Sequence, residues 1–254
     1  MQPWSLRQAL DDLALNLVFF TRLPLPTFDF HGRTLAQAIW AAPLAGLAVA
    51  VIGGIIYAVA SSLGLAAGPS AALALAATMV ATGCLHEDGL SDVADGFGGG
   101  HTREKKLEIM RDSRIGSYGA AALGLSLLIR WSALSEFGHP AHVLLALVAA
   151  HMASRGMAGA FMHLSPPARA DGLAAGAGAV SSETATVGAA IGAAALLLLG
   201  LSGAIVAAIV LAALFLAFRT LCLRQIGGHT GDTVGALQQF GEILVLLVAS
   251  IFLS

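Results

Sequence analysis

The stretch HEDGLSDVADGFGGGHTREKKLEIMRDSRIGSYG, residues 86–119, interrupts an otherwise apolar chain. It holds 7 of the 15 carboxylates and 5 of the 13 lysines and arginines in the 254-residue sequence. Across the whole chain 57% of the residues are hydrophobic and only 11% are charged. This concentration of charge marks residues 86–119 as the chemical centre of the protein, and the remainder as the scaffold that holds it.

Three aspartates in this stretch follow a helical spacing. Asp88, Asp92 and Asp95 stand at i, i+4 and i+7, so a helix beginning after Leu85 would place them on one face. Carboxylates this close repel one another, and a divalent cation is the natural compensation. Oxygen ligands suit Mg²⁺ or Mn²⁺ better than Zn²⁺, and Mg²⁺ usually keeps water and substrate phosphate among its ligands. The spacing therefore predicts a metal site for phosphate chemistry.

A solvated acidic helix face is the simpler alternative for these carboxylates. Two neighbouring features favour the metal site. Glycines at positions 89, 96 and 98–100 leave room for phosphate groups to approach the backbone. The cations that follow can hold a polyanion, arginine by bidentate contacts and lysine as a point charge. These cations are Arg103, Lys105, Lys106, Arg111 and Arg114.

The same stretch resembles the signature of the cobalamin synthase family, the adenosylcobinamide-GDP ribazoletransferases, which are Mg²⁺-dependent integral membrane enzymes. Three further blocks resemble that family in the same order: FFTRLPLP (19–26), SPPARADGLAAGAG (165–178) and GGHTGDTVGALQQFGE (227–242). Together the blocks extend over nearly the whole chain. The resemblance implies transfer of a phosphocobinamide group from adenosylcobinamide-GDP to a ribose hydroxyl of α-ribazole or its 5′-phosphate, with release of GMP.

Within that reaction, we expect Mg²⁺ on Asp88, Asp92 and Asp95 to bridge the diphosphate and neutralise charge on the leaving GMP. One carboxylate or His86 would assist deprotonation of the attacking hydroxyl. Glu87 lies about 100° from Asp88 around a helix, so it is expected to be that base or a ligand to a second metal.

The composition predicts the fold class. A mean hydropathy of +0.82 lies outside the range of soluble globular domains. We expect an all-α, polytopic integral membrane helix bundle with about seven transmembrane helices, forming one catalytic domain over residues 1–254. The expected spans are 39–65, 71–85, 118–134, 143–162, 186–201, 205–221 and 243–253 with some residues before it.

Residues 1–35 are expected to form an interfacial segment. The apolar run Leu13–Phe20 is too short and too charged at its flanks to span a bilayer, and Pro24 and Pro26 end any helix there. Arg22 is predicted either to anchor this segment at the membrane surface or to bind substrate phosphate.

Ionisable residues inside the apolar segments usually face the protein interior. His151 and Arg155 form such an i, i+4 pair, and Arg155 is predicted to bind substrate or to pair with a carboxylate of the acidic segment. Arg130, near the end of an expected span, is predicted to snorkel to the interface. Cys84 and Cys222 are expected to be buried small hydrophobes.

A second polar island lies at residues 227–242. Its glycines predict a closely approached loop, and His229 offers a hydrogen bond to substrate. Asp232 is predicted to reach across the bundle and share the metal with Asp88 and Asp92, the alternative being an ordinary turn aspartate. Arg169 and Asp171, in the block 165–178, are expected to line a substrate entrance.

Two other functions fit parts of this pattern. A CDP-alcohol phosphotransferase also places carboxylates on membrane helices, and Asp88, Gly89 and Asp92 resemble the opening of its motif. This chain lacks the following Ala-Arg and the closing pair of aspartates. An ion- or proton-coupled transporter would bury its carboxylates near mid-membrane, whereas here they run into a basic hydrophilic segment.

The cations between residues 103 and 114 also predict orientation, because cytoplasmic loops are enriched in lysine and arginine. We therefore expect a multi-pass protein of the bacterial inner membrane whose active site faces the cytoplasm. The expected partners are the two substrates and the lipid bilayer, with no nucleic acid, and the sequence predicts no oligomeric state.

Labelling of a single cysteine tests this orientation. In a Thr102→Cys variant lacking the native cysteines, the new thiol should resist a membrane-impermeant maleimide in intact cells and react once the cells are opened. Ready modification from outside would place the segment on the opposite face.

Overall fold

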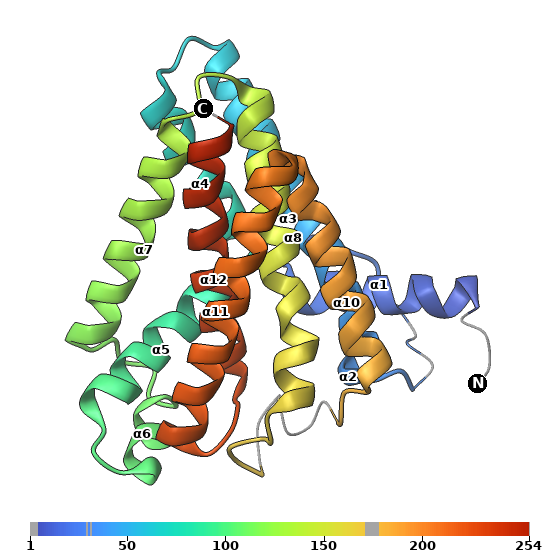
Figure 1. Cartoon of the computed structure of the whole chain (residues 1–254), viewed down its shortest axis with the longest axis vertical. Helices are drawn as coiled ribbons and strands as arrows, with labels where there is room; N and C mark the ends of the chain where they lie inside the picture. Colours follow the sequence, from blue (N-terminus) through green and yellow to red (C-terminus); the bar gives the residue numbers. More distant parts are fainter. Residues whose placement is uncertain (1–4, 29, 31, 171–177, 254) are drawn as a thin grey trace.

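The structure, a computed structural model, describes residues 5–28, 30, 32–170 and 178–253, and the regular elements within them are helical. Figure 1 shows an elongated bundle from which α1 projects to one side at about mid-height. The elements, in chain order, are α1 (Leu6–Phe20), α2 (Leu35–Ala38), η1 (Ile39–Ala41), α3 (Ala42–Ser62), α4 (Ala67–Thr82), α5 (Leu85–Gly99), α6 (Arg103–Ile109), α7 (Ser117–Ser135), α8 (Pro140–Leu164), α10 (Ser182–Ala195), η2 (Leu196–Leu199), α11 (Gly200–Ile226) and α12 (Gly231–Phe252).

Helix α8 is the centre of the bundle and packs against α3, α10 and α12. Small residues make this packing close. A Cβ atom at Gly156 would lie 2.9 Å from the carbonyl oxygen of Gly188 and 3.0 Å from Cα of Gly192, so α8 and α10 meet almost backbone to backbone. Helices in membranes commonly associate through such small residues, because van der Waals contact replaces the hydrophobic effect there.

Four segments of the described chain are long and apolar enough to cross a membrane, or five if the bent pair α4–α5 counts as one span. The expected number of about seven is not confirmed. The expected span 118–134 is helical, as α7, and long enough to cross a membrane, but it is less apolar than the four candidate segments. The expected spans 186–201 and 205–221 fall in one apolar segment, Ser182–Ile226, whose two legs meet at η2 in Figure 1.

A sharp corner separates α4 from α5. The two helices are bent by 89°, and both corner residues have left-handed backbone angles, with φ of 62° at Gly83 and 58° at Cys84. Such angles are uncommon for a residue with a Cβ atom. The corner leaves Cys84 exposed, so its predicted burial was wrong, whereas Cys222 is buried as expected. Because of this bend, α5 crosses toward α12 instead of continuing along α4.

A buried arginine joins the helices that the corner brings together. Arg130 on α7 is 1% exposed, and its Nη1 donates to Glu87 of α5 at 3.1 Å and to Glu242 of α12 at 3.0 Å. The prediction that Arg130 snorkels to the interface was therefore wrong. Helix α7 packs on both α5 and α12, so the side chain points into the bundle and finds two carboxylates there.

The polar network continues through α8. Nδ1 of His151 lies 3.3 Å from Glu242 and 2.9 Å from Nη1 of Arg155, and both side chains are buried as expected. Gln238 and Gln239 of α12 donate to Glu242 and Glu87, at 2.7 Å and 3.3 Å. The charges of Arg130 and Arg155 thus balance those of Glu87 and Glu242. The two glutamines donate hydrogen bonds to carboxylate oxygens that water cannot reach.

Removal of the central cation should be costly. Arg130→Leu leaves Glu87 and Glu242 buried without their shared partner, which in comparable cases costs about 3–5 kcal/mol of stability. We expect a much lower unfolding temperature for purified Arg130→Leu in lipid nanodiscs. The control is Arg224→Leu, at an exposed arginine near the end of α11. Equal stability of the two variants would show that the network does not hold the helices together.

Candidate active site

The predicted acidic helix face is confirmed. Helix α5 runs from Leu85 to Gly99, and Asp88, Asp92 and Asp95 pass along it from exposed to half-buried to buried. Glu87 and Asp88 occupy the first turn, where the helix dipole favours negative charge. The acidic face is therefore exposed at the end of α5 that carries Asp88 and buried at the end that carries Asp95.

Asp232 lies against this face. It stands in the first turn of α12, after the N-cap Thr230. A Cβ atom at Gly89 would lie only 2.7 Å from the backbone oxygen of Asp232, so glycine is what lets the two helices touch. The carboxylates of Asp88, Asp95 and Asp232 all repel that of Asp92. The expected convergence of the two polar islands is thus present, and ligation of a metal by Asp232 stays a prediction.

Asp95 has a different environment from the other aspartates. Its two carboxylate oxygens accept hydrogen bonds from the backbone N–H groups of Gly116, at 2.7 Å, and Gly119, at 2.9 Å. These N–H groups belong to the first turn of α7, which otherwise lacks partners for them. Asp95 therefore caps α7 and fastens it to α5, whatever further role it has.

The donor chemistry at the meeting of α5 and α12 fits Mg²⁺. Asp88, Asp92 and Asp232 offer only oxygen, and the guanidinium of Arg169 lies 3.4 Å from the carboxylate of Asp232. In the part of the chain that the structure describes, no three His, Cys, Asp or Glu side chains are placed to hold a metal by themselves. This suits an ion that takes few protein ligands and completes its shell with water and phosphate.

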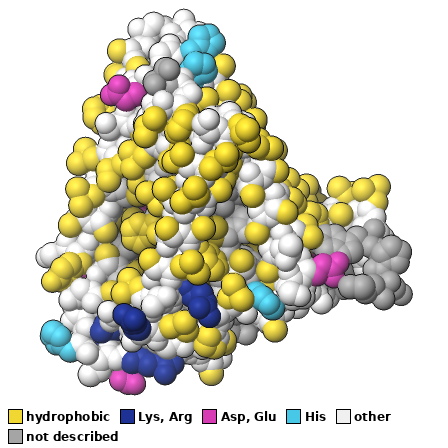
Figure 2. Space-filling model, in the orientation of Figure 1, with side chains coloured by type: hydrophobic (Ala, Val, Ile, Leu, Met, Phe, Trp, Pro, Cys, Tyr) yellow, Lys and Arg dark blue, Asp and Glu magenta, His cyan; other side chains and the backbone are white. Residues whose placement is uncertain are grey.

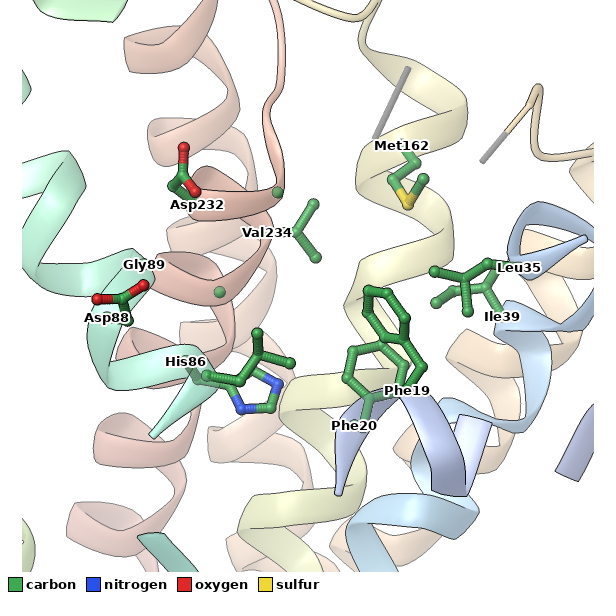
Figure 3. A pocket seen from close by; sticks show the side chains of 13 residues that line it. Phe19, Phe20, Leu35, Ile39, His86, Asp88, Gly89, Met162, Asp232 and Val234 are labelled. Carbon is green, nitrogen blue, oxygen red and sulfur yellow. The ribbon is translucent and has the colours of Figure 1, made fainter. Parts of the chain in front are cut away.

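A pocket of about 200 Å³ opens beside these carboxylates. Figure 3 shows its two unlike walls. One wall consists of polar and small residues of α5 and α12: His86, Asp88, Gly89, Gly231, Asp232 and Gly235. The other is apolar and comes mainly from α1, α2, η1 and α8: Phe19, Phe20, Leu35, Ile39 and Met162, with Leu85 and Val234 between the two. The pocket therefore suits a molecule with one apolar and one polar end.

His86 and Glu87 point to different surroundings, although they are neighbours in sequence. His86 lines the pocket, and its ring stacks on Phe20 with centroids 5.8 Å apart. Glu87 is 5% exposed and paired with Arg130. A group held in a buried ion pair is a poor general base, so of the two expected bases His86 is better placed.

The predicted phosphate-binding cations lie mostly at one exposed end of the bundle, the lower end in Figure 2. Lys105 pairs with Glu108 at 2.8 Å and Arg114 with Asp112 at 2.5 Å. The hydrogen bonds from Arg114 lower the pKa of Asp112 to about 2. Arg111 is exposed, and its charge reaches Asp232. Of these cations, Arg111 is therefore the one whose charge acts on a carboxylate of the candidate site.

Arg103 has a structural contact instead. Its Nη2 donates to the carbonyl oxygen of Ala168 at 2.7 Å, which ties α6 to the loop that follows α8. Arg22 packs on the α4–α5 corner, where a Cβ atom at Gly83 would lie 2.9 Å from its Cγ. Arg155 contacts His151 in the buried network and does not line the pocket.

The loop 165–169 and the second polar island pair with each other. His229 N–H donates to the Pro166 carbonyl and Ala168 N–H donates to the His229 carbonyl, both at 2.8 Å. The His229 ring is buried, with Nδ1 3.0 Å from the Ser165 carbonyl, and burial lowers the pKa of this imidazole. His229 therefore serves to join the two loops through its backbone and its ring.

Sequence reasoning gave Arg169 only a place at a substrate entrance, and the structure sets it against Asp232. Asp171, its expected companion, lies outside the described residues. The signal that could have found the Arg169 contact is the block 165–178 itself, since a basic and an acidic residue in two glycine-rich loops are natural partners.

Comparison with known proteins agrees with this geometry. A family model described as cobalamin-5-phosphate synthase matches residues 12–250. A protein of Mesorhizobium japonicum named adenosylcobinamide-GDP ribazoletransferase is 71% identical over 250 residues, which cover 98% of this chain and 96% of that protein. Proteins of the same name from Bradyrhizobium diazoefficiens and Ralstonia nicotianae are 50% and 42% identical, over 98% and 96% of this chain and 96% of each relative. No solved structure matches.

Proposed function

The chain belongs to the cobalamin-5-phosphate synthase family, and we propose that the pocket between α1, α5 and α12 is its active site. The chain functions as an adenosylcobinamide-GDP ribazoletransferase, which catalyses the final step of nucleotide-loop assembly in cobalamin synthesis. The family match also removes the two alternatives, a CDP-alcohol phosphotransferase and an ion-coupled transporter.

One observation carries the location of the site. Asp88 and Asp92 of α5 lie far in sequence from Asp232 of α12, yet the three carboxylates act on one another, and Asp88 and Asp232 line a pocket. Clustered like charges weaken a fold. Their retention beside a pocket supports a charged ligand that compensates them, such as a metal ion with a diphosphate.

The reaction joins two substrates in this site. A ribose hydroxyl oxygen of ribazole attacks the phosphorus that carries the cobinamide, a new P–O bond forms, and the bond to the GMP oxygen breaks. The hydroxyl proton passes to a group that faces the pocket, which is His86 or Asp88. Glu87 is not that group, because Arg130 and Gln239 hold it in the core.

We further propose that the carboxylates of Asp88, Asp92 and Asp232 supply the protein ligands of Mg²⁺, one or two of them at a time, with water and substrate phosphate as the other ligands. When bound, this ion would neutralise negative charge on the diphosphate and on the departing GMP. Asp95 supports the site from behind by holding α7 through Gly116 and Gly119. Arg169 sets the position of Asp232 at the pocket rim.

The exposed cations give the donor substrate an approach. Arg111, Arg114 and Lys105 are exposed at one end of the bundle and would attract the doubly esterified diphosphate of adenosylcobinamide-GDP. This end of the bundle faces the cytoplasm in our proposal, since positively charged loops are retained on that side of the inner membrane.

Charge removal tests the site. Asp88→Asn, Asp92→Asn and Asp232→Asn keep the size of the side chain, and each should lower the rate of GMP release by about a hundredfold or more at limiting Mg²⁺. Rates are measured with purified protein in nanodiscs over a range of Mg²⁺ concentrations.

The matched control is Asp112→Asn, at an aspartate paired with Arg114 outside the pocket, and it should keep its rate and its Mg²⁺ dependence. If two of the three pocket variants titrate with Mg²⁺ like the wild type, the proposed metal site is wrong. If the wild type releases no GMP from adenosylcobinamide-GDP and ribazole, the assigned reaction itself fails.

A further inference from the structure

We infer that the apolar wall of the pocket binds the flat aromatic base of ribazole and directs its ribose toward Asp88 and Asp232. This inference rests on the proposed function, because it assigns one substrate to one part of the proposed site. It gives Phe19 and Phe20 the task of recognising the acceptor.

The shape of the pocket supports a nucleoside with its base on one side and its sugar on the other. Figure 3 shows the apolar side chains on one side of the pocket and Asp88 and Asp232 on the other, with His86 and Val234 between them. The rings of Phe19 and Phe20 meet edge to face, with centroids 4.9 Å apart, and present aromatic surface at a right angle. Aromatic surface of this kind binds bases by stacking, whereas carboxylates and imidazole suit sugar hydroxyls.

The aromatic wall is built to stay in place, although α1 leaves the bundle sideways (Figure 1). Asp12 of α1 is 1% exposed and accepts a bidentate pair from Arg33, at 2.8 and 2.6 Å, and a bond from the Trp40 indole at 2.8 Å. Asn16 donates to the Ala38 carbonyl at 2.7 Å. A helix that served only as a membrane anchor would not need these buried bonds. They hold α1 in one position, and with it the last turn, which carries the two phenylalanines.

The other candidate occupants fit less well. A pocket of about 200 Å³ is smaller than the roughly 300–1,000 Å³ typical of a site for a whole drug-sized ligand, so it can take a bicyclic base but not a corrin macrocycle. Guanine, the base of the donor, has polar edges that need hydrogen-bond partners, and the five apolar-wall side chains provide none. Charge also favours ribazole as the occupant. A charged diphosphate is costly to bury against apolar side chains, whereas an uncharged base is not.

Phe19→Ala tests this assignment, because Phe19 is half-buried and its removal opens the wall without emptying the core. Loss of base stacking should raise the KM for ribazole about tenfold and leave the KM for adenosylcobinamide-GDP unchanged. The second readout is the Kd of ribazole alone for the full chain in nanodiscs, measured by calorimetry without metal or donor, which should rise by the same factor. Phe28→Ala, at an exposed phenylalanine outside the pocket, is the control.

The outcomes separate this inference from the proposed function. Unchanged ribazole constants in an active Phe19→Ala enzyme overturn the inference and leave the function intact. A raised KM for the donor alone also overturns it and assigns the pocket to guanine. If the wild type binds ribazole but does not join it to the cobinamide phosphate, the proposed function is contradicted. The ribazole Kd values of the wild type and of Phe19→Ala then still test the inference. Should Phe19→Ala not fold, Met162→Ala on the opposite side of the apolar wall takes its place, with the same expected changes.

Discussion

The ion pairs of Arg130 with Glu87 and Glu242 determine how the functional helices meet. One buried guanidinium, about 3 Å from each carboxylate, links α7 to α5 and α12 at once. In a low-dielectric interior, separating these groups would leave charges unpaired, so the three helices have a strong reason to keep one arrangement. Glu87 directly precedes Asp88 in the chain. The ion pair that fixes Glu87 in the core therefore also fixes the backbone that carries Asp88 in the proposed site.

The pocket follows from that arrangement and from one glycine. Gly89 lets α5 approach the backbone of Asp232, and the α4–α5 corner supplies the change of direction that makes the approach possible. Asp95 then fixes the start of α7 on the same helix. Two consecutive residues of α5 thus reach different surroundings, Glu87 the core and Asp88 the pocket. The site is polar toward these helices and apolar toward α1, which suits two substrates of unlike chemistry.

Much of this was predictable because it depends on local pattern. The spacing of Asp88, Asp92 and Asp95 predicts their shared helix face, and the glycines of residues 227–235 indicate that the second island is closely approached. The burial of His151 and Arg155 follows from the cost of charge in an apolar helix. The family resemblance extends the reading to the substrates, which no local pattern specifies.

The parts that sequence reasoning missed depend on contacts between distant segments. Arg130 looks like an interfacial residue until Glu87 and Glu242 are known to lie beside it. Nothing near Asp95 in sequence reveals that the N–H groups of Gly116 and Gly119 will reach it. The corner at Gly83 and Cys84 exposes a cysteine within an apolar run, and the number of spans changes because α7 is less apolar than a typical membrane helix.

Disulfide cross-linking of the two islands tests the central claim most directly, because it measures whether they meet without relying on activity. The native thiols are first replaced by Cys84→Gly, which suits a φ of 58°, and Cys222→Ala. In this background, Asp88→Cys with Asp232→Cys should cross-link rapidly in native membranes through a short bis-methanethiosulfonate, which forms one disulfide with each cysteine. Asp88→Cys with Asp112→Cys should not. Failure of the first pair to react, in a protein that still inserts and folds, would contradict the account.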